Sequence, residues 1–92
     1  MGINPKNLIH HELIGLNVRV YSSTNPNMIG LEGKIIDETR NMLIIEDAHR
    51  IEKKLPKSQS EFVFALPDEK CVKVRGNILV IRPEDRIRKR FR

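Results

Sequence analysis

Two apolar runs separated by a polar cluster occupy residues 30–46. A run rich in β-branched residues ends at a polar cluster, residues 37–41, and a second apolar run, Met42–Ile45, follows it directly. This order is typical of a β-hairpin. Asn41 tolerates positive φ better than its neighbours, so we predict that it closes the turn in that conformation. Gly33 would weaken pairing inside the first strand, so we expect a sharp bend or bulge there, as a small closed barrel requires.

The rest of the chain contains further short strand patterns. Residues 16–21 alternate between apolar and polar side chains, which predicts a half-buried strand, and the polar segment 22–28 predicts a loop. Four more segments have strand patterns: residues 50–55 with Ile51 and Leu55 on one side, the alternating Phe62, Phe64 and Leu66, residues 71–74, and the continuous apolar run 78–81. Six or seven short strands separated by turns predict a mainly β fold, a small antiparallel barrel.

Helix signals occur only towards the two ends. Asn4-Pro5 is a helix start signal, and we predict a short amphipathic helix that runs to about Leu13, with Gly15 as its stop. Pro83–Asp85 opens a second helix, because proline suits the first position and two carboxylates suit the positive end of the helix dipole. We therefore expect one domain of three parts: an N-terminal helix in residues 1–15, a barrel in 16–82 and a basic helix or tail in 83–92.

Positive charge is concentrated near the C-terminus. The formal net charge is +5, and residues 82–92 hold six of the 17 basic residues but only two of the 12 acidic ones. This segment predicts a polyanionic partner, either nucleic acid or an acidic membrane surface, with a solvated tail as the alternative. No apolar run approaches the roughly 20 residues of a membrane span, and we find no secretory signal pattern. We therefore expect a cytoplasmic protein without a membrane segment.

Residues with catalytic or metal-binding chemistry do not form a cluster in the sequence. His10 and His11 would point about 100° apart on a helix, so we predict two surface histidines. Cys71 is the only cysteine and is expected to be a packed or half-exposed thiol. Phe62 and Phe64 are expected in the core rather than on a base-stacking surface. We find no paired carboxylates, activated nucleophile or phosphate-binding glycine loop, so we predict no active site and no bound cofactor.

Several motifs carry a resemblance to known families. Residues 33–43 and Val74–Ile81 resemble the two motifs of the Sm family of RNA-binding barrels. A closer resemblance covers nearly the whole chain and is to the Sm-like protein component 1 family of archaeal ribonuclease P, which is related to the eukaryotic Pop4 subunit. Five segments carry it: His11–Leu16, Ser23–Pro26, Gly30–Gly33, Asp37–Asn41 and Arg82–Ile87.

This resemblance implies a small Sm-like or SH3-like barrel with a role in transfer RNA processing. The chain would be a non-catalytic subunit of the ribonucleoprotein that removes the 5′ leader from precursor transfer RNA. Metal ions held in the RNA would carry out the chemistry, so magnesium is expected for the holoenzyme and not for this chain. The implied partners are a zinc-ribbon protein subunit, as a heterodimer, and the specificity domain of the catalytic RNA, with precursor transfer RNA met indirectly.

We predict that the barrel is a rigid mount for side chains that contact RNA phosphate and sugar. Arginine suits this role because its planar fork donates two hydrogen bonds to one phosphate. The predicted RNA-binding residues are Lys6, Ser23, Thr24, Asn25, Lys34, Arg40, Asn41, Arg75, Arg82, Arg86, Arg88, Lys89 and Arg90. The predicted protein-interface residues are Leu8, Ile9 and Leu13. For these three, packing on the chain's own barrel is an equally good alternative.

Three other function classes remain as alternatives. A ring-forming Sm-like protein would bind uridine-rich single strands through Asn41 and Arg75. Residues 52–67 and the terminal helices would alter the barrel edges through which such rings assemble, which favours a heterodimer. A metal-dependent nuclease would cleave RNA alone, and the missing acidic cluster counts against it. A purely protein-binding adaptor would have no RNA affinity, and the basic C-terminus counts against it.

Overall fold

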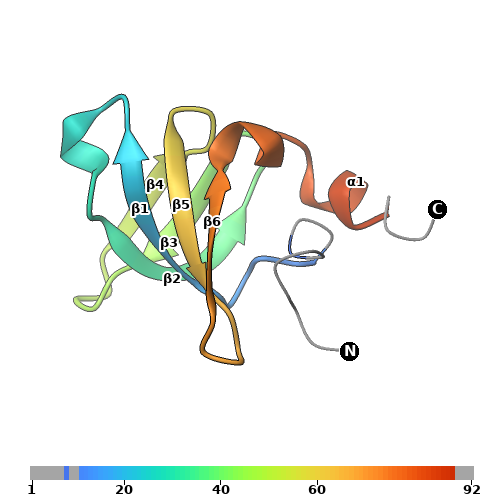
Figure 1. Cartoon of the computed structure of the whole chain (residues 1–92), viewed down its shortest axis with the longest axis horizontal. Coiled ribbons are helices and arrows are strands. Elements are labelled where there is room, and N and C mark those ends of the chain that lie inside the picture. Colours follow the sequence, from blue (N-terminus) through green and yellow to red (C-terminus); the bar gives the residue numbers. More distant parts are fainter. Residues whose placement is uncertain (1–7, 9–10, 89–92) are drawn as a thin grey trace.

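The computed structural model describes Leu8 and residues 11–88, with side chains up to Asp85. Within the described residues, the elements with defined bounds are six strands, two 3-10 helices and one α-helix, and Figure 1 shows their arrangement. They are β1 (Asn17–Ser23), η2 (Pro26–Met28), β2 (Glu32–Glu38), β3 (Met42–Glu46), β4 (Glu52–Pro56), β5 (Ser60–Ala65), β6 (Cys71–Arg75), η3 (Gly76–Leu79) and α1 (Pro83–Arg88). The predicted mainly β fold of six or seven short strands is therefore confirmed, and the number of strands described is six. Among the described residues, no helix has the length and apolar character needed to cross a membrane.

The strands form one antiparallel sheet in the order β4-β3-β2-β1-β5-β6. In Figure 1, β1, β5 and β6 lie side by side in front, and β2, β3 and β4 curl behind them. The register shifts between Val20 and Ser22 in β1 and between Ile35 and Asp37 in β2. Such bulges bend a strand and increase its twist, which lets the sheet fold over its own core into a barrel-like shape. Within the described chain, β4 and β6 each pair with a neighbour on one side only.

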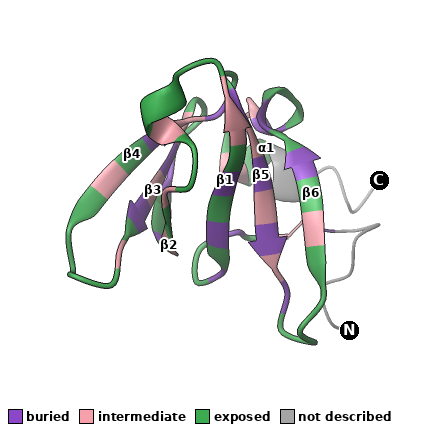
Figure 2. Ribbon diagram, turned by 60° about the vertical axis from the view of Figure 1, so that its left-hand side comes forward, coloured by how far each residue is buried: buried purple, intermediate pink, exposed green. Residues whose placement is uncertain are grey.

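The hydrophobic core lies inside this curl. Alternating residues of each strand point inward, which produces the banded pattern of buried and exposed positions in Figure 2. Phe62 and Phe64 are fully buried, as predicted, with ring centroids 6.2 Å apart. The buried core residues are Leu8, Leu13, Leu16, Val18, Val20, Ile35, Leu43, Ile45, Leu55, Phe62, Phe64, Leu66, Val74 and Leu79.

Two details of the central hairpin differ from the prediction. Asn41 does not adopt positive φ. Instead the turn is closed by Thr39, whose amide donates to the Met42 carbonyl (3.0 Å) and whose hydroxyl accepts from the Met42 amide (3.1 Å). The bulge in β2 does not fall at Gly33. A Cβ atom on Gly33 would lie 2.5 Å from the Glu46 carbonyl oxygen, so this glycine allows a close backbone approach.

Predictions for three apolar residues or segments were wrong. The run 78–81 is not a strand, because η3 turns the chain after β6, which buries Leu79 and leaves Ile78 exposed. Ile51 is exposed because β4 begins one residue later. Cys71 is exposed and not packed, since it opens the edge strand β6 on the side facing away from the core.

The N-terminal prediction is partly wrong. The predicted helix does not reach Leu13, because residues 11–13 are not helical, and the earlier part of that prediction mostly lies outside the described residues. Leu8 and Leu13 pack in the chain's own core, so the structure supports the alternative of internal packing for these two. At the other end, α1 begins at Pro83 as predicted, with Glu84 and Asp85 in its first turn. Residues 89–92 lie outside the described residues.

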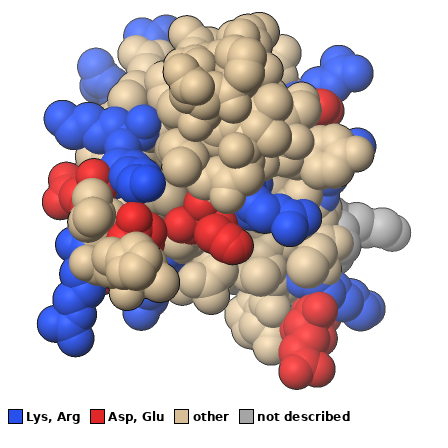
Figure 3. Space-filling model, turned by 90° about the vertical axis from the view of Figure 1, so that its left-hand side faces the viewer, with Lys and Arg blue, Asp and Glu red and all other residues tan. Residues whose placement is uncertain are grey.

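Charged side chains are mixed on the side of the molecule that lies at the left of Figure 1. Figure 3 shows basic and acidic groups interspersed around a broad uncharged area. This agrees with the sequence of residues 20–31, which include η2 and contain no charged residue. A polyanion would find no uniformly positive surface on this side.

Candidate nucleic-acid interface

Segments that are far apart in the sequence meet at one end of the sheet, which we call the loop end (residues 23–25, 39–41, 57–60 and 75–82). The Thr24 amide donates to the Gln59 carbonyl (3.0 Å), and the Ser60 hydroxyl lies 3.0 Å from that of Ser23. The Lys57 amide donates to the Asn41 carbonyl (2.8 Å). These bonds bring five of the predicted RNA-binding residues to one end of the molecule: Ser23, Thr24, Asn25, Arg40 and Asn41. Two more, Arg75 and Arg82, belong to the same loop end.

A buried ion pair holds the loop end together. Lys57 Nζ lies 2.7 Å from Glu38 Oε2, and the two side chains are 0% and 1% exposed. The same ammonium donates to the carbonyls of Thr39 (2.7 Å) and Leu79 (2.9 Å). It therefore ties the 39–41 turn to η3. The local sequence does not predict that Lys57 is buried, because a lysine among Pro, Ser and Gln has the pattern of an exposed loop.

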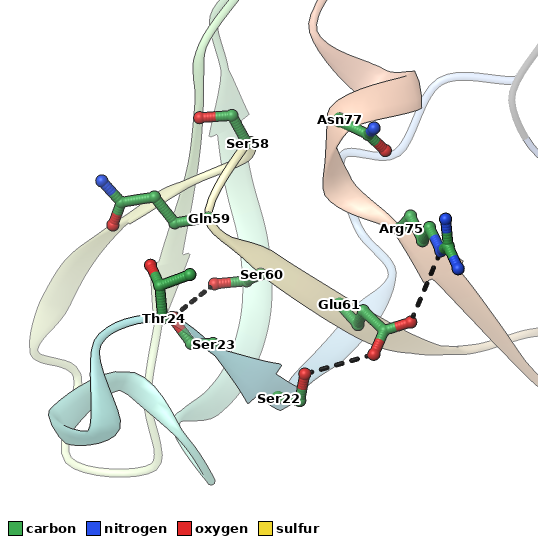
Figure 4. Close-up of a pocket in the computed structure, with 9 residues that line it drawn as sticks. All are labelled: Ser22, Ser23, Thr24, Ser58, Gln59, Ser60, Glu61, Arg75 and Asn77. Carbon is green, nitrogen blue, oxygen red and sulfur yellow. Dashed lines mark hydrogen bonds and ion pairs between the residues drawn. The ribbon is translucent and has the colours of Figure 1, made fainter.

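A polar groove of about 340 Å³ opens at the loop end (Figure 4). Its lining is mainly hydroxyl and amide side chains with one acid and one base: Ser22, Ser23, Thr24, Ser58, Gln59, Ser60, Glu61, Arg75 and Asn77. Glu61 accepts from the Ser22 hydroxyl (3.2 Å), and its other oxygen lies 3.9 Å from Arg75 Nε. The Arg75 side chain is 78% exposed, so this contact leaves its guanidinium open to a ligand. Such a groove offers hydrogen bonds to sugar and base edges and a cation to a phosphate.

A second, smaller hollow of about 260 Å³ lies where the 39–41 turn meets the start of α1. It is lined by Arg40, Val80, Ile81, Arg82 and Asp85. The hollow places the arginine of the 39–41 turn near the arginine that precedes α1. Two cations and one carboxylate give this part of the loop end a positive balance.

The other predicted site residues have different positions. Asn25 caps η2 by accepting from the Asn27 amide (3.1 Å), which gives this side chain a structural role. Lys34 is exposed but lies away from the loop end. It lies at the place where β2 pairs with the start of β1. The side chains of Arg86 and Arg88 are not described, and four predicted residues lie outside the described residues: Lys6, Ile9, Lys89 and Arg90.

The local sequence also does not predict a pair of residues, Tyr21 and Lys73, on the outer surface of the sheet. Lys73 Nζ lies 4.5 Å from the centroid of the Tyr21 ring. Alternation predicts that Tyr21 points outward, but no local pattern predicts that β1 and β6 flank the same strand. Only the strand order brings these two side chains together.

Fold and site together define a small β-sheet protein that presents polar loops and arginines at one end. Within the described ranges, no three His, Cys, Asp or Glu side chains are grouped so that they could hold a metal ion. The class is therefore that of a small β domain with a polar, cation-flanked surface.

Comparison with known proteins identifies the family. The family model described as ribonuclease P/MRP, subunit p29, matches residues 6–89. Ribonuclease P protein component 1 of Methanosarcina mazei is 47% identical over 95 residues, which cover 94% of this chain and 86% of the relative. The corresponding protein of Pyrococcus furiosus is 49% identical over 90 residues, covering 98% and 70%.

A solved structure agrees. It is described as Mth11, a homologue of human RNase P protein Rpp29, and it has a TM-score of 0.62 and 44% sequence identity, covering 84% of this chain and 99% of its own. The chain therefore belongs to the p29 family of ribonuclease P protein subunits. The relationship to Sm proteins and to Pop4 stays a prediction.

Proposed function

We propose that this chain is a non-catalytic, RNA-binding subunit of ribonuclease P that acts in removal of the 5′ leader from precursor transfer RNA. The observation that carries the proposal is the family match over residues 6–89. The groove at the loop end supports it, because hydroxyl, amide and guanidinium groups are what RNA sugar and phosphate require.

In this proposal the sheet is a rigid mount and the loop end is the RNA contact. Arg75 lines the groove, and Arg40 and Arg82 line the smaller hollow. The basic residues of α1 and beyond extend the positive charge past Arg82. Because backbone contacts carry little sequence information, the expected recognition is of RNA shape and phosphate.

The proposed partners follow from the same assignment. The catalytic RNA would be bound through its specificity domain, a zinc-ribbon subunit would form a heterodimer with this chain, and precursor transfer RNA would be met indirectly. Magnesium would be bound by the RNA and would supply the electrostatic stabilisation of the cleavage step. The cytoplasm is the proposed compartment.

The test is cleavage of precursor transfer RNA at limiting magnesium. Four reactions are compared: this chain with its zinc-ribbon partner but without RNA, catalytic RNA alone, catalytic RNA with this chain, and catalytic RNA with this chain and its zinc-ribbon partner. We expect the protein to stimulate cleavage only when the RNA is present. Cleavage by the protein alone would contradict the non-catalytic role. No effect of the complete pair would reject the assignment, and a solution mass several times that of the monomer would then favour a ring.

A further inference from the structure

The outer surface of β1, β5 and β6 forms one continuous wall (Figures 1 and 2). Arg19 lies opposite Val63, and Val63 lies opposite Lys73, so these three side chains cross the wall in one row. Ser22, Glu61 and Arg75 form the next row towards the loop end. All of these positions face away from the core, because their neighbours Val18, Val20, Phe62, Phe64 and Val74 are buried.

The bulge in β1 adds an aromatic side chain to this wall. Val20 pairs with Phe62 and Ser22 with Glu61, which leaves Tyr21 as the extra residue between them. Bulges re-aim a side chain and are over-represented beside functional sites. Tyr21 is 51% exposed, whereas Phe62 and Phe64 are fully buried. An aromatic ring therefore lies half open to solvent on a strand wall, with the ammonium of Lys73 over it.

The charges of the wall favour a polyanion. Its basic side chains, Arg19, Lys73 and Arg75, are exposed. Its acidic side chains are the half-buried Glu61 and, at the boundary with β2, Glu32, which lies opposite Arg19. No ion pair joins Arg19 to Glu32 among the described residues. Lys73 and Arg75 also lie on an edge strand, where solvent reaches them from the side. Through Glu61 and Arg75 the wall runs directly into the polar groove of the loop end (Figure 4).

We propose that this wall binds a single-stranded segment of RNA, with one base stacked on Tyr21 and its neighbouring phosphates held by Arg19, Lys73 and Arg75. The inference rests on the proposed RNA-binding function and names the part of the RNA that this surface takes. An exposed ring flanked by cations is how single strands are bound without sequence preference, because every base has a π-face. Bases inside a duplex are already stacked on each other, so the ring gains nothing from a double helix.

The test uses the full chain with two probes, an oligouridylate of about 12 nucleotides, within the usual site size, and a duplex RNA of similar length. Tyr21→Ser is expected to weaken oligouridylate binding about 5- to 150-fold, with duplex binding and the salt dependence unchanged. Lys73→Gln is expected to reduce the slope of log affinity against log salt by about 0.7. Ile51→Ser, which removes an equally exposed apolar side chain from the β3–β4 turn, is the matched control and should bind like the parent chain.

A second variant covers the case in which Tyr21→Ser loses stability. The chain has no tryptophan, so Tyr21→Trp places a single indole at the stacking position. Oligouridylate should quench its fluorescence, and the duplex should not. Equal binding by Tyr21→Ser and the parent chain, equal weakening for both RNAs, or an unquenched indole would overturn the inference alone. If the parent chain binds neither probe and also does not bind the catalytic RNA, both this inference and the proposed function are overturned.

Discussion

Lys57 Nζ lies 2.7 Å from Glu38 Oε2, and both side chains are buried. Removing two charges from water costs about as much as their attraction returns, so such a pair adds little net stability. Its consequence is geometric, since the ammonium also bonds the carbonyls of Thr39 and Leu79. The pair connects the 39–41 turn, the β4–β5 turn and η3, which are the segments that build the loop end.

Lys57→Met should destabilise the chain by about 3–5 kcal/mol. The substitution removes the cation and leaves the Glu38 carboxylate buried without it. Urea unfolding followed by circular dichroism measures the loss. Lys57→Met combined with Glu38→Leu is the control, because removing both charges should recover most of the stability. A single variant within about 1 kcal/mol of the parent chain would show that the pair is not required.

Gly76→Ala should destabilise the chain by about 1–3 kcal/mol or more. A Cβ atom at this position would lie 1.7 Å from the Lys57 carbonyl oxygen and 2.8 Å from Phe62 Cε2, so backbone must move. Asn77→Ala, at the exposed next residue, is the matched control and should change stability by about 0.5 kcal/mol or less. Equal melting temperatures for the two variants would contradict the close packing of η3 against β5.

Asp47→Asn should make stability less sensitive to acid. Hydrogen bonds from the amides of Ile51 and His49 and the charge of Lys53 hold the pKa of the Asp47 carboxyl below its ordinary value of 3.8. Because the folded-state pKa is lowered, the carboxylate stabilises the fold above about pH 4, and this contribution is lost as pH falls through the lower folded value. Urea unfolding at a series of acidic pH values should therefore give a shallower decline for Asp47→Asn. Parallel declines would show that Asp47 does not contribute.

Neutralising the basic C-terminal residues should weaken RNA binding and its salt dependence. If Arg86, Arg88, Lys89 and Arg90 each contact one phosphate, changing all four to Gln should reduce the log–log salt slope by about 2.8 for a single strand or 3.6 for a duplex. The matched control removes four cations elsewhere, at Arg50, Lys53, Lys54 and Lys70, and should change the slope less. Unchanged binding by the C-terminal variant would end the proposed role of these residues.

Much of the fold could be predicted from local patterns. The inward positions of β1 and β5 follow from period-two alternation, and the start of α1 follows from Pro83 and the two carboxylates after it. One prediction failed because it rested on apolar composition alone. Residues 78–81 have the composition of a buried strand, but residues 76–79 form η3, where Gly76 lies close to the Lys57 backbone. Nothing in the local sequence reports that approach.

The candidate site shows the same division. Sequence alone predicted the small β fold, the positive C-terminal segment and candidate residues such as Ser23, Thr24 and Arg75, because polarity and charge are local properties. The tertiary structure alone decided that Lys57 is buried against Glu38 and that Tyr21 lies beside Lys73. Periodicity reports which side chains can share a face of one strand. Which strands become neighbours, and which loops meet at one end, depends on long-range pairing and packing that no short stretch of sequence contains.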